Sequence, residues 1–159
     1  MTPTGTCAEC GFAWDMSYDD AVTIVGRAPS WFAKAFQAAS FEAPPPGVWT
    51  AGAYLWHVVD VVRYGTERLW SLSFDPAAGV PVWDADVMAA ARAYEGRSVR
   101  VGLHALEVAT EDWLVAAGVV PRNVTAVQPQ SGAIDARTSV VRNAHEVVHH
   151  VLDVRRQRV

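Results

Sequence analysis

The sequence predicts an all-α protein, an up-down four-helix bundle with long connections. Three observations indicate this class: apolar residues recur at helical spacing in four long stretches, cap or break signals bound each stretch, and no run alternates like a convincing strand. Each helix would carry an apolar stripe that a neighbour must cover, and a bundle covers all of them. At 159 residues the chain is most simply one domain, residues 1–159.

The N-terminal part of the chain is expected to be a loop or short knuckle, over residues 1–16, followed by a helical stretch from about residue 18 to 40. Pro29 lies within that stretch and either kinks it or starts a second segment, because proline cannot continue the hydrogen-bond ladder. The Pro-Pro-Pro-Gly run at 44–47 is a firm break.

The remaining helices follow in order. The second is expected over residues 50–73, with a threonine as its N-cap, and a short helix over 85–94. A third long helix covers about 98–117 and stops at a glycine followed by a proline. Residues 119–135 form a long polar connection that could contain a short hairpin, and the last helix runs over about 138–156.

Composition and charge exclude several classes of function. The net charge of −4 argues against nucleic acid as a partner, because phosphate binding needs a basic surface. No apolar run approaches the roughly 20 residues of a membrane span, and the N-terminus lacks the layout of a secretion signal. We therefore expect a soluble, cytoplasmic protein that acts on a small molecule. Bundles of this kind often dimerise through exposed helix faces, so a homodimer stays open.

The most informative stretch is His145-Glu146-Val147-Val148-His149. Two histidines four apart on a helix lie one turn apart on one face, so both imidazoles can reach one metal ion. The same letters spell the HExxH motif of zinc proteases, with Glu146 as general base. That remote alternative needs a third ligand downstream, where Asp153 is the only carboxylate side chain, and it needs a sheet edge to bind the peptide.

An upstream histidine can complete the site. His57 lies in the middle of the second predicted helix, away from its main apolar stripe, and a bundle can bring it to the pair His145 and His149. Three imidazoles would leave the metal an open coordination position for substrate or water. Asp60 and Asp153 each lie one turn from one of these histidines, where they can support the ligands. Alternatively, His57 is a hydrogen-bonded core residue.

Proton transfer has two candidate residues, Glu146 and Asp60, although Glu146 is equally well explained as a solvent-facing or structural side chain. His150 points about 100° away from His149 around the helix, and we expect it at the surface or at the edge of a pocket.

The two cysteines, Cys7 and Cys10, form a C-x-x-C pair, which in a cytosolic chain is more often a metal half-site or redox pair than a structural disulfide. If the N-terminal knuckle folds over the mouth of the bundle, both could join the histidines. A four-coordinate Cys/His site would leave no room for substrate. This alternative predicts a non-enzymatic, metal-stabilised binding module. A separate half-site, a disulfide or free thiols are the other outcomes.

The stretches at residues 49–61 and 143–153 resemble the DinB-like superfamily, and the resemblance covers the chain from about Ser17 to Arg156. The opening Cys-Ala-Glu-Cys-Gly-Phe at residues 7–12 resembles the start of a mostly actinobacterial branch of these proteins. The resemblance implies a four-helix bundle that holds zinc or nickel through one histidine of the second helix and an i,i+4 pair of the fourth. Those positions fall on His57, His145 and His149.

The resemblance also implies an activity. Characterised relatives include thiol S-transferases that use bacillithiol or mycothiol and a mycothiol-dependent maleylpyruvate isomerase, in which the metal activates the small thiol as a thiolate. Many relatives continue from the last histidine with Arg-Gly-Gln, whereas this chain continues with His150-Val151-Leu152. From the activities of these relatives we expect a metal-dependent small-thiol (mycothiol-type) S-transferase or a related isomerase or hydrolase, and the changed residues after His149 leave the identity of the thiol open.

Overall fold

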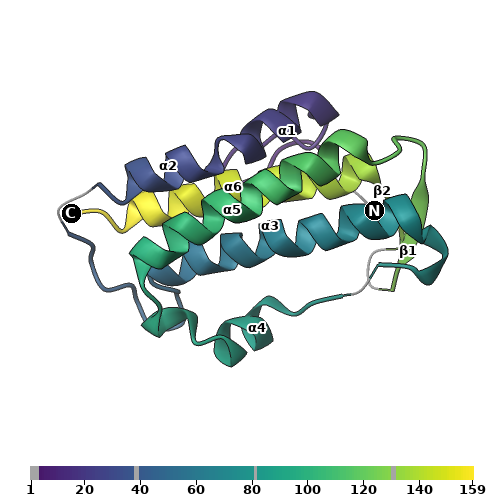
Figure 1. The fold of residues 1–159 in the computed structure, drawn as a ribbon. Coiled ribbons are helices and arrows are strands. Elements are labelled where there is room, and N and C mark those ends of the chain that lie inside the picture. Colours follow the sequence, from purple (N-terminus) through teal and green to yellow (C-terminus); the bar gives the residue numbers. More distant parts are fainter. Residues whose placement is uncertain (1–3, 38–39, 81, 130–131) are drawn as a thin grey trace.

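The computed structural model describes residues 4–37, 40–80, 82–129 and 132–159. The α-helices are α1 (Tyr18–Gly26), α2 (Ala28–Ala35), α3 (Ala51–Phe74), α4 (Ala85–Ala91), α5 (Val99–Val119) and α6 (Ala136–Arg156). Two short 3-10 helices, η1 (Pro76–Ala78) and η2 (Tyr94–Gly96), and a hairpin of β1 (Thr125–Gln128) and β2 (Gly132–Asp135) complete the described elements. The prediction of an all-α bundle is confirmed, with α1 and α2 together forming one of its four rods (Figure 1).

The long helices begin where short polar side chains cap them. The hydroxyl oxygen of Thr50 accepts a hydrogen bond from a backbone N–H in the first turn of α3, Ser98 does the same for α5, and Asp135 for α6. Such caps satisfy N–H groups that have no partner within the helix. At Pro29 the first stretch divides, and the proline occupies the first turn of α2, where its missing N–H costs no hydrogen bond.

The helices do not simply alternate in direction, which differs from the up-down order expected from the sequence. Figure 1 shows α3 and α5 running the same way, because residues 75–80 and 82–98, with α4 among them, return along the length of the bundle. A Cβ at Gly52 would meet Val99, and a Cβ at Gly102 would meet Leu55, so the beginnings of both helices lie together. The long return connection is what permits this parallel pair.

A buried polar contact joins three helices near the middle of the bundle. The side-chain oxygen of Asn143 on α6 accepts a hydrogen bond from Nε1 of Trp113 on α5 at 3.0 Å. The side-chain nitrogen of Asn143 donates to the carbonyl of Val61 on α3 at 3.3 Å. The helices approach this closely because Gly65, on α3, has no side chain.

The hairpin lies within the long connection after α5 and leads directly into α6. It is antiparallel, with Thr125 opposite Asp135, and it is the only sheet in the part of the chain that the structure describes. A zinc protease of the HExxH type would need a larger sheet edge beside its metal helix, which the described residues do not provide. None of the described helices combines the length and apolar character needed to cross a bilayer.

We expect Gly65→Ala to lower the free energy of unfolding by about 2–4 kcal/mol. An added Cβ would lie 2.3 Å from the side-chain oxygen of Asn143 and 2.9 Å from Nε1 of Trp113, and both groups are fixed by their hydrogen bond. Urea unfolding measures the change. The matched control is Gly118→Ala on exposed helix surface, where a Cβ meets nothing within 4 Å and helix propensity predicts an unchanged or slightly higher stability. Equal effects of both substitutions would contradict the packing argument.

Candidate metal centres and the adjoining pocket

The N-terminal segment folds into a tight knuckle. Thr6 and Ala13 form an antiparallel bridge, the backbone N–H of Cys7 donates to the carbonyl of Phe12, and that of Gly11 donates to the carbonyl of Cys7, both at 2.9 Å. Gly11 adopts a φ of +72°, a left-handed conformation that favours glycine. The turn therefore presents the C-x-x-C pair on a compact loop, as the sequence suggested.

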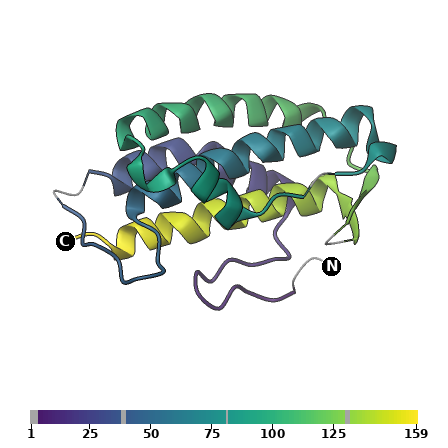
Figure 2. The ribbon, with the colours of Figure 1, turned by 90° about the horizontal axis from the view of Figure 1, so that it is seen from below.

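The knuckle lies alongside α6 (Figure 2). Phe12 is buried, and its ring meets the imidazole of His145 edge-on at 5.5 Å between centroids. The indole of Trp14 lies against the same imidazole at 4.4 Å. Arg137, in the first turn of α6, donates hydrogen bonds to the carbonyls of Trp14 and Met16. Aromatic packing and hydrogen bonds thus hold the knuckle over one stripe of α6.

This packing creates the first candidate metal centre, formed by Cys7, Cys10, His145 and His149, whose ligand atoms lie within 4.8 Å of one another. Sγ of Cys7 is 3.7 Å from Nδ1 of His149. Two ligands on a tetrahedral zinc ion, at about 2.3 Å for sulfur and 2.1 Å for nitrogen, would be about 3.6 Å apart. Nε2 of His145 is buried without a hydrogen-bond partner, as expected of an atom reserved for a metal.

The thiol of Cys7 is suited to bind a cation. Its pKa falls from 9.0 to about 6, chiefly because the backbone N–H of Cys10 donates to the sulfur and, next, because of the hydrogen bond with His145. The thiolate is the form that binds metal. By contrast, burial raises the pKa of Cys10, which would bind as a thiolate only with the help of the metal charge.

A second candidate metal centre lies on the neighbouring stripe of α6, where Glu146 meets two histidines. Oε2 of Glu146 is 3.1 Å from Nε2 of His57 and 3.2 Å from Nε2 of His150. Ligands at about 2.1 Å from a tetrahedral ion are about 3.4 Å apart, so these separations suit one ion. On its other side, Nδ1 of His150 lies 2.9 Å from a carboxylate oxygen of Asp153, an arrangement that typically orients a metal-binding histidine.

In this second group, burial and the neighbouring charged groups shift the pKa values of the side chains in opposite directions. Burial acts to raise the pKa of Glu146, but hydrogen bonds with His145, His150 and His57 hold it well below its usual range. Burial would also lower the pKa of His150, but Asp153 and Glu146 outweigh it and raise the pKa to about 9. For His57, which is only 5% exposed, burial dominates and lowers the pKa. As metal ligands, Glu146 would therefore be negatively charged and His57 neutral.

The structure distributes the sequence-predicted ligands differently from the expected triad. His57 shares a group with Glu146 and His150, whereas His145 and His149 share one with Cys7 and Cys10. Among the described residues, no group of mutually close ligand atoms unites His57 with both His145 and His149. The reason is the helical repeat, which turns consecutive residues about 100° apart. The assignment of those three histidines to one ion stays a prediction.

His150 was expected at an edge and instead lies in the centre of the second group. It stands four residues after Glu146, as His149 does after His145. The sequence therefore already contained this second pair of possible metal ligands one helical turn apart. The pattern alone could not show which of the two stripes faces α3, because that depends on how α6 is rotated in the bundle.

Asp60 is buried and has partners other than the metal-type groups. Arg92 and the hydroxyl of Tyr94 both donate hydrogen bonds to its carboxylate, and Arg63 lies 3.8 Å away. Arg92 and Tyr94 belong to the connection that returns along the bundle, so Asp60 anchors that connection to α3. The structure therefore gives this aspartate a packing role that the sequence did not suggest, and its role in proton transfer stays a prediction.

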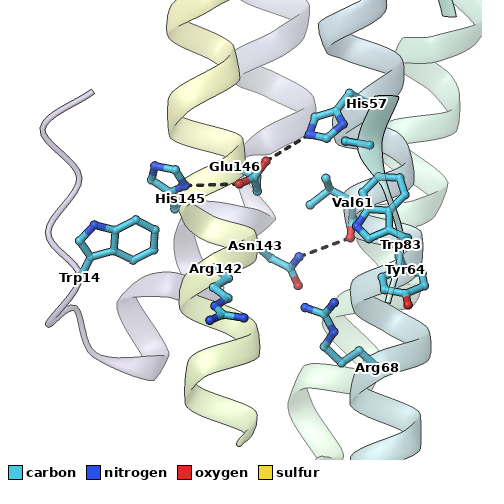
Figure 3. Close-up of a pocket in the computed structure, with 11 residues that line it drawn as sticks. Trp14, His57, Val61, Tyr64, Arg68, Trp83, Arg142, Asn143, His145 and Glu146 are labelled. Carbon is cyan, nitrogen blue, oxygen red and sulfur yellow. Dashed lines mark hydrogen bonds and ion pairs between the residues drawn. The ribbon is translucent and has the colours of Figure 1, made fainter. Parts of the chain in front are cut away.

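A cavity of about 380 Å³ opens beside the second group (Figure 3). It lies between α3, α6, the segment before α4 and the knuckle. Its lining includes His57 and Glu146 at one end and two arginines, Arg68 and Arg142, at the other. No local pattern points to these arginines, because only the packing of α3 against α6 places them at the cavity.

Fold and site together define an all-α, four-helix-bundle protein. Beside a pocket it holds two groups of histidine, cysteine and glutamate side chains that could bind a metal ion. Among solved structures, the fold is similar to that of YfiT from Bacillus subtilis, with a TM-score of 0.72 over 98% of this chain and 92% of that one, at 13% sequence identity. YfiT is described as a probable metal-dependent hydrolase with an unusual four-helix bundle topology. The likeness shows that the two proteins share a fold. No family model and no curated protein matches the sequence.

We expect Asp60→Asn to lower the free energy of unfolding by about 2 kcal/mol, because a neutral amide replaces the buried carboxylate that pairs with the partly exposed Arg92. Metal content should stay that of the wild type, since Asp60 belongs to neither group of ligand atoms. Urea unfolding and elemental analysis on the same preparation measure both quantities. Loss of metal at unchanged stability would contradict the anchoring role.

Proposed function

We propose that this protein is a metal-dependent hydrolase with two metal centres, a closed one that fixes the N-terminal knuckle and an open one that carries the chemistry. The observation that carries the proposal is the division of α6 into two stripes. His145 and His149 meet the cysteines, while Glu146 and His150 meet His57 at the wall of a pocket.

The closed centre would be structural. Two thiolates and two imidazoles complete the four-coordinate shell that zinc adopts in structural sites, with no position left for substrate. Its ligands come from two segments far apart in the sequence, Cys7 and Cys10 on the knuckle and His145 and His149 on α6. Binding would therefore fix the knuckle, with Phe12 and Trp14, against the helix. This is the closed Cys/His site that the sequence left as an alternative.

The open centre would be catalytic. Two histidines and one glutamate are the protein ligands of several zinc hydrolases, and three ligands leave a position for water or substrate. A divalent ion bound there would lower the pKa of a water molecule and polarise the bond under attack. Since His57 and Glu146 both line the 380 Å³ cavity, substrate has a place beside that position.

The surrounding residues hold these donors in place. The imidazole of His57 stacks against the indole of Trp83, with 5.6 Å between centroids and 8° between planes, and the indole of Trp49 lies 5.2 Å away. Asp153 fixes the orientation of His150 through Nδ1. Oε1 of Glu146 faces Nδ1 of His145 at 3.4 Å, which couples the two groups. The aromatic rings also limit access of bulk water to the donors.

Transfer of a small thiol, as the resemblance implies, is the second candidate. It would use the same open position, with a thiol in place of water. The ligand set favours hydrolysis, because the group that faces the pocket holds one glutamate and two histidines instead of the three histidines that the resemblance implies. YfiT is also described as a probable hydrolase. The thiol candidate is kept because the sequence resemblance is to families that contain such transferases.

We expect two zinc ions per chain after expression and dialysis in zinc. The double variant Cys7→Ser/Cys10→Ser should retain one, and His57→Ala should also retain one, because each removes donors from a different centre. Elemental analysis and zinc-edge X-ray absorption measure this: the Cys variant should lose the sulfur ligands, whereas His57→Ala should keep them. The knuckle should become susceptible to limited proteolysis only in the Cys variant.

His104→Ala is the matched control for the histidine substitution, because His104 lies on the exposed face of α5 with its side chain 77% accessible. It should retain both ions. A single ion that is lost in His57→Ala and keeps no sulfur ligand would contradict the two-centre proposal and restore the three-histidine site.

For activity, we expect zinc-dependent hydrolysis of activated esters or amides to fall at least about 100-fold in Glu146→Gln, because the neutral amide is a poor ligand and a poor proton acceptor. Chromogenic release with and without added small thiols separates hydrolysis from thiol transfer, and mass spectrometry of the product identifies a thioether or thioester. Equal rates for Glu146→Gln and the wild type would contradict the assignment of the open centre.

A further inference from the structure

The end of the cavity farthest from His57 holds a buried arginine, Arg68, with which no described carboxylate forms an ion pair. Arg68 of α3 is only 8% exposed, and its Nε is buried without a hydrogen-bond partner. Among the described residues, no carboxylate forms an ion pair with Arg68, whose guanidinium lies 5.2 Å from the ring centroid of Tyr64. A buried charge without a counter-charge is costly, so a function is the usual reason for keeping one.

A second arginine faces the same space. Arg142 of α6 lines the cavity, and Figure 3 shows its guanidinium and that of Arg68 directed toward one another across it. Nη1 of Arg142 donates to the side-chain oxygen of Gln128 at 3.5 Å, which holds it in this direction. Burial and the charge of Arg142 both lower the pKa of Arg68. An anion placed between the two guanidinium groups would supply Arg68 with a counter-charge and would also be attracted by Arg142.

The walls between the two ends are largely aromatic and apolar. They are formed by Trp14 of the knuckle, Trp83 of the segment before α4, and Val61 and Ala85. Trp83 also stacks on Tyr64. A ligand that matches the whole cavity therefore has an anionic end, an apolar or aromatic body, and a reactive group at the opposite end beside His57 and Glu146.

We infer that this pocket binds a small organic carboxylate whose carboxyl group lies between Arg68 and Arg142. The planar fork of a guanidinium matches the two oxygens of a carboxylate. The aromatic walls favour an organic acid over inorganic phosphate, which has no apolar body. The inference deepens the proposed function, because it makes the substrate a carboxylic acid that carries its hydrolysable bond at the other end. Anion binding itself does not require a metal.

The test is calorimetric titration of the full chain with benzoate, in the zinc-loaded and the metal-free states. Benzamide has nearly the same shape without the charge, and inorganic phosphate has charge without the apolar body. We expect benzoate to bind at least about tenfold more tightly than benzamide, which corresponds to the loss of charge-assisted hydrogen bonds. Equal affinities for benzoate and benzamide, or tighter binding of phosphate than of benzoate, would overturn the inference.

Arg68→Met replaces the guanidinium by an apolar side chain of similar length. It should weaken the binding of benzoate at least about tenfold and leave the binding of benzamide unchanged. The melting temperature of the protein should stay equal or rise, because a buried charge without a counter-charge is removed. Arg142→Gln should also weaken benzoate, which covers the case in which the first variant does not fold. Arg100→Gln, on the exposed surface of α5, is the control and should bind as the wild type does.

The two states of the protein separate this inference from the proposed function. Benzoate that binds with or without zinc and requires Arg68 supports the inference, even if the metal analysis refutes the open centre. Benzoate that binds only to the zinc-loaded protein and is indifferent to Arg68→Met would be a ligand of the metal, which overturns the inference and leaves the proposed function in place.

Discussion

The rotation of α6 in the bundle is the constraint on which the site depends. Consecutive residues of a helix point about 100° apart, whereas residues four apart nearly align. The run from His145 to His150 therefore forms two adjacent stripes of metal-type side chains. Because the stripe of Glu146 and His150 faces His57 on α3, the stripe of His145 and His149 is turned toward the knuckle. The rotation of this one helix thus decides which residues make up each candidate centre.

The course of the chain supplies the remaining walls. The connection after α3 returns along the bundle instead of joining α5 by a short turn, and this makes α3 and α5 parallel. The same connection brings Trp83 over His57 and is held to α3 by Asp60 through Arg92 and Tyr94. An alternating bundle with short turns would have no such cover, so the parallel pair of helices and the pocket have one structural origin.

Buried polar groups are concentrated along the facing sides of α3 and α6. His57, Arg68 and Asn143 are all nearly inaccessible, in a bundle whose other buried positions are mostly apolar. Asn143 satisfies its hydrogen bonds within the protein, which makes it structural. Arg68 does not, and neither does one ring nitrogen of His57. These two side chains therefore keep hydrogen-bonding atoms that the protein does not use, and both line the cavity.

Local signals in the sequence account for the helices and for the kinds of side chain that could bind a metal. Apolar periodicity and the caps at Thr50 and Ser98 are local signals, so the helices and even the hairpin were foreseeable. The i,i+4 histidines and the C-x-x-C pair are also local, and they predicted side chains that could bind a metal, which the structure gathers in two groups. The packing of the helices settles which of the metal-binding side chains meet. It also makes α3 and α5 parallel and buries Arg68. Those outcomes depend on the rotation of α6 and on contacts between distant segments, which no local pattern encodes.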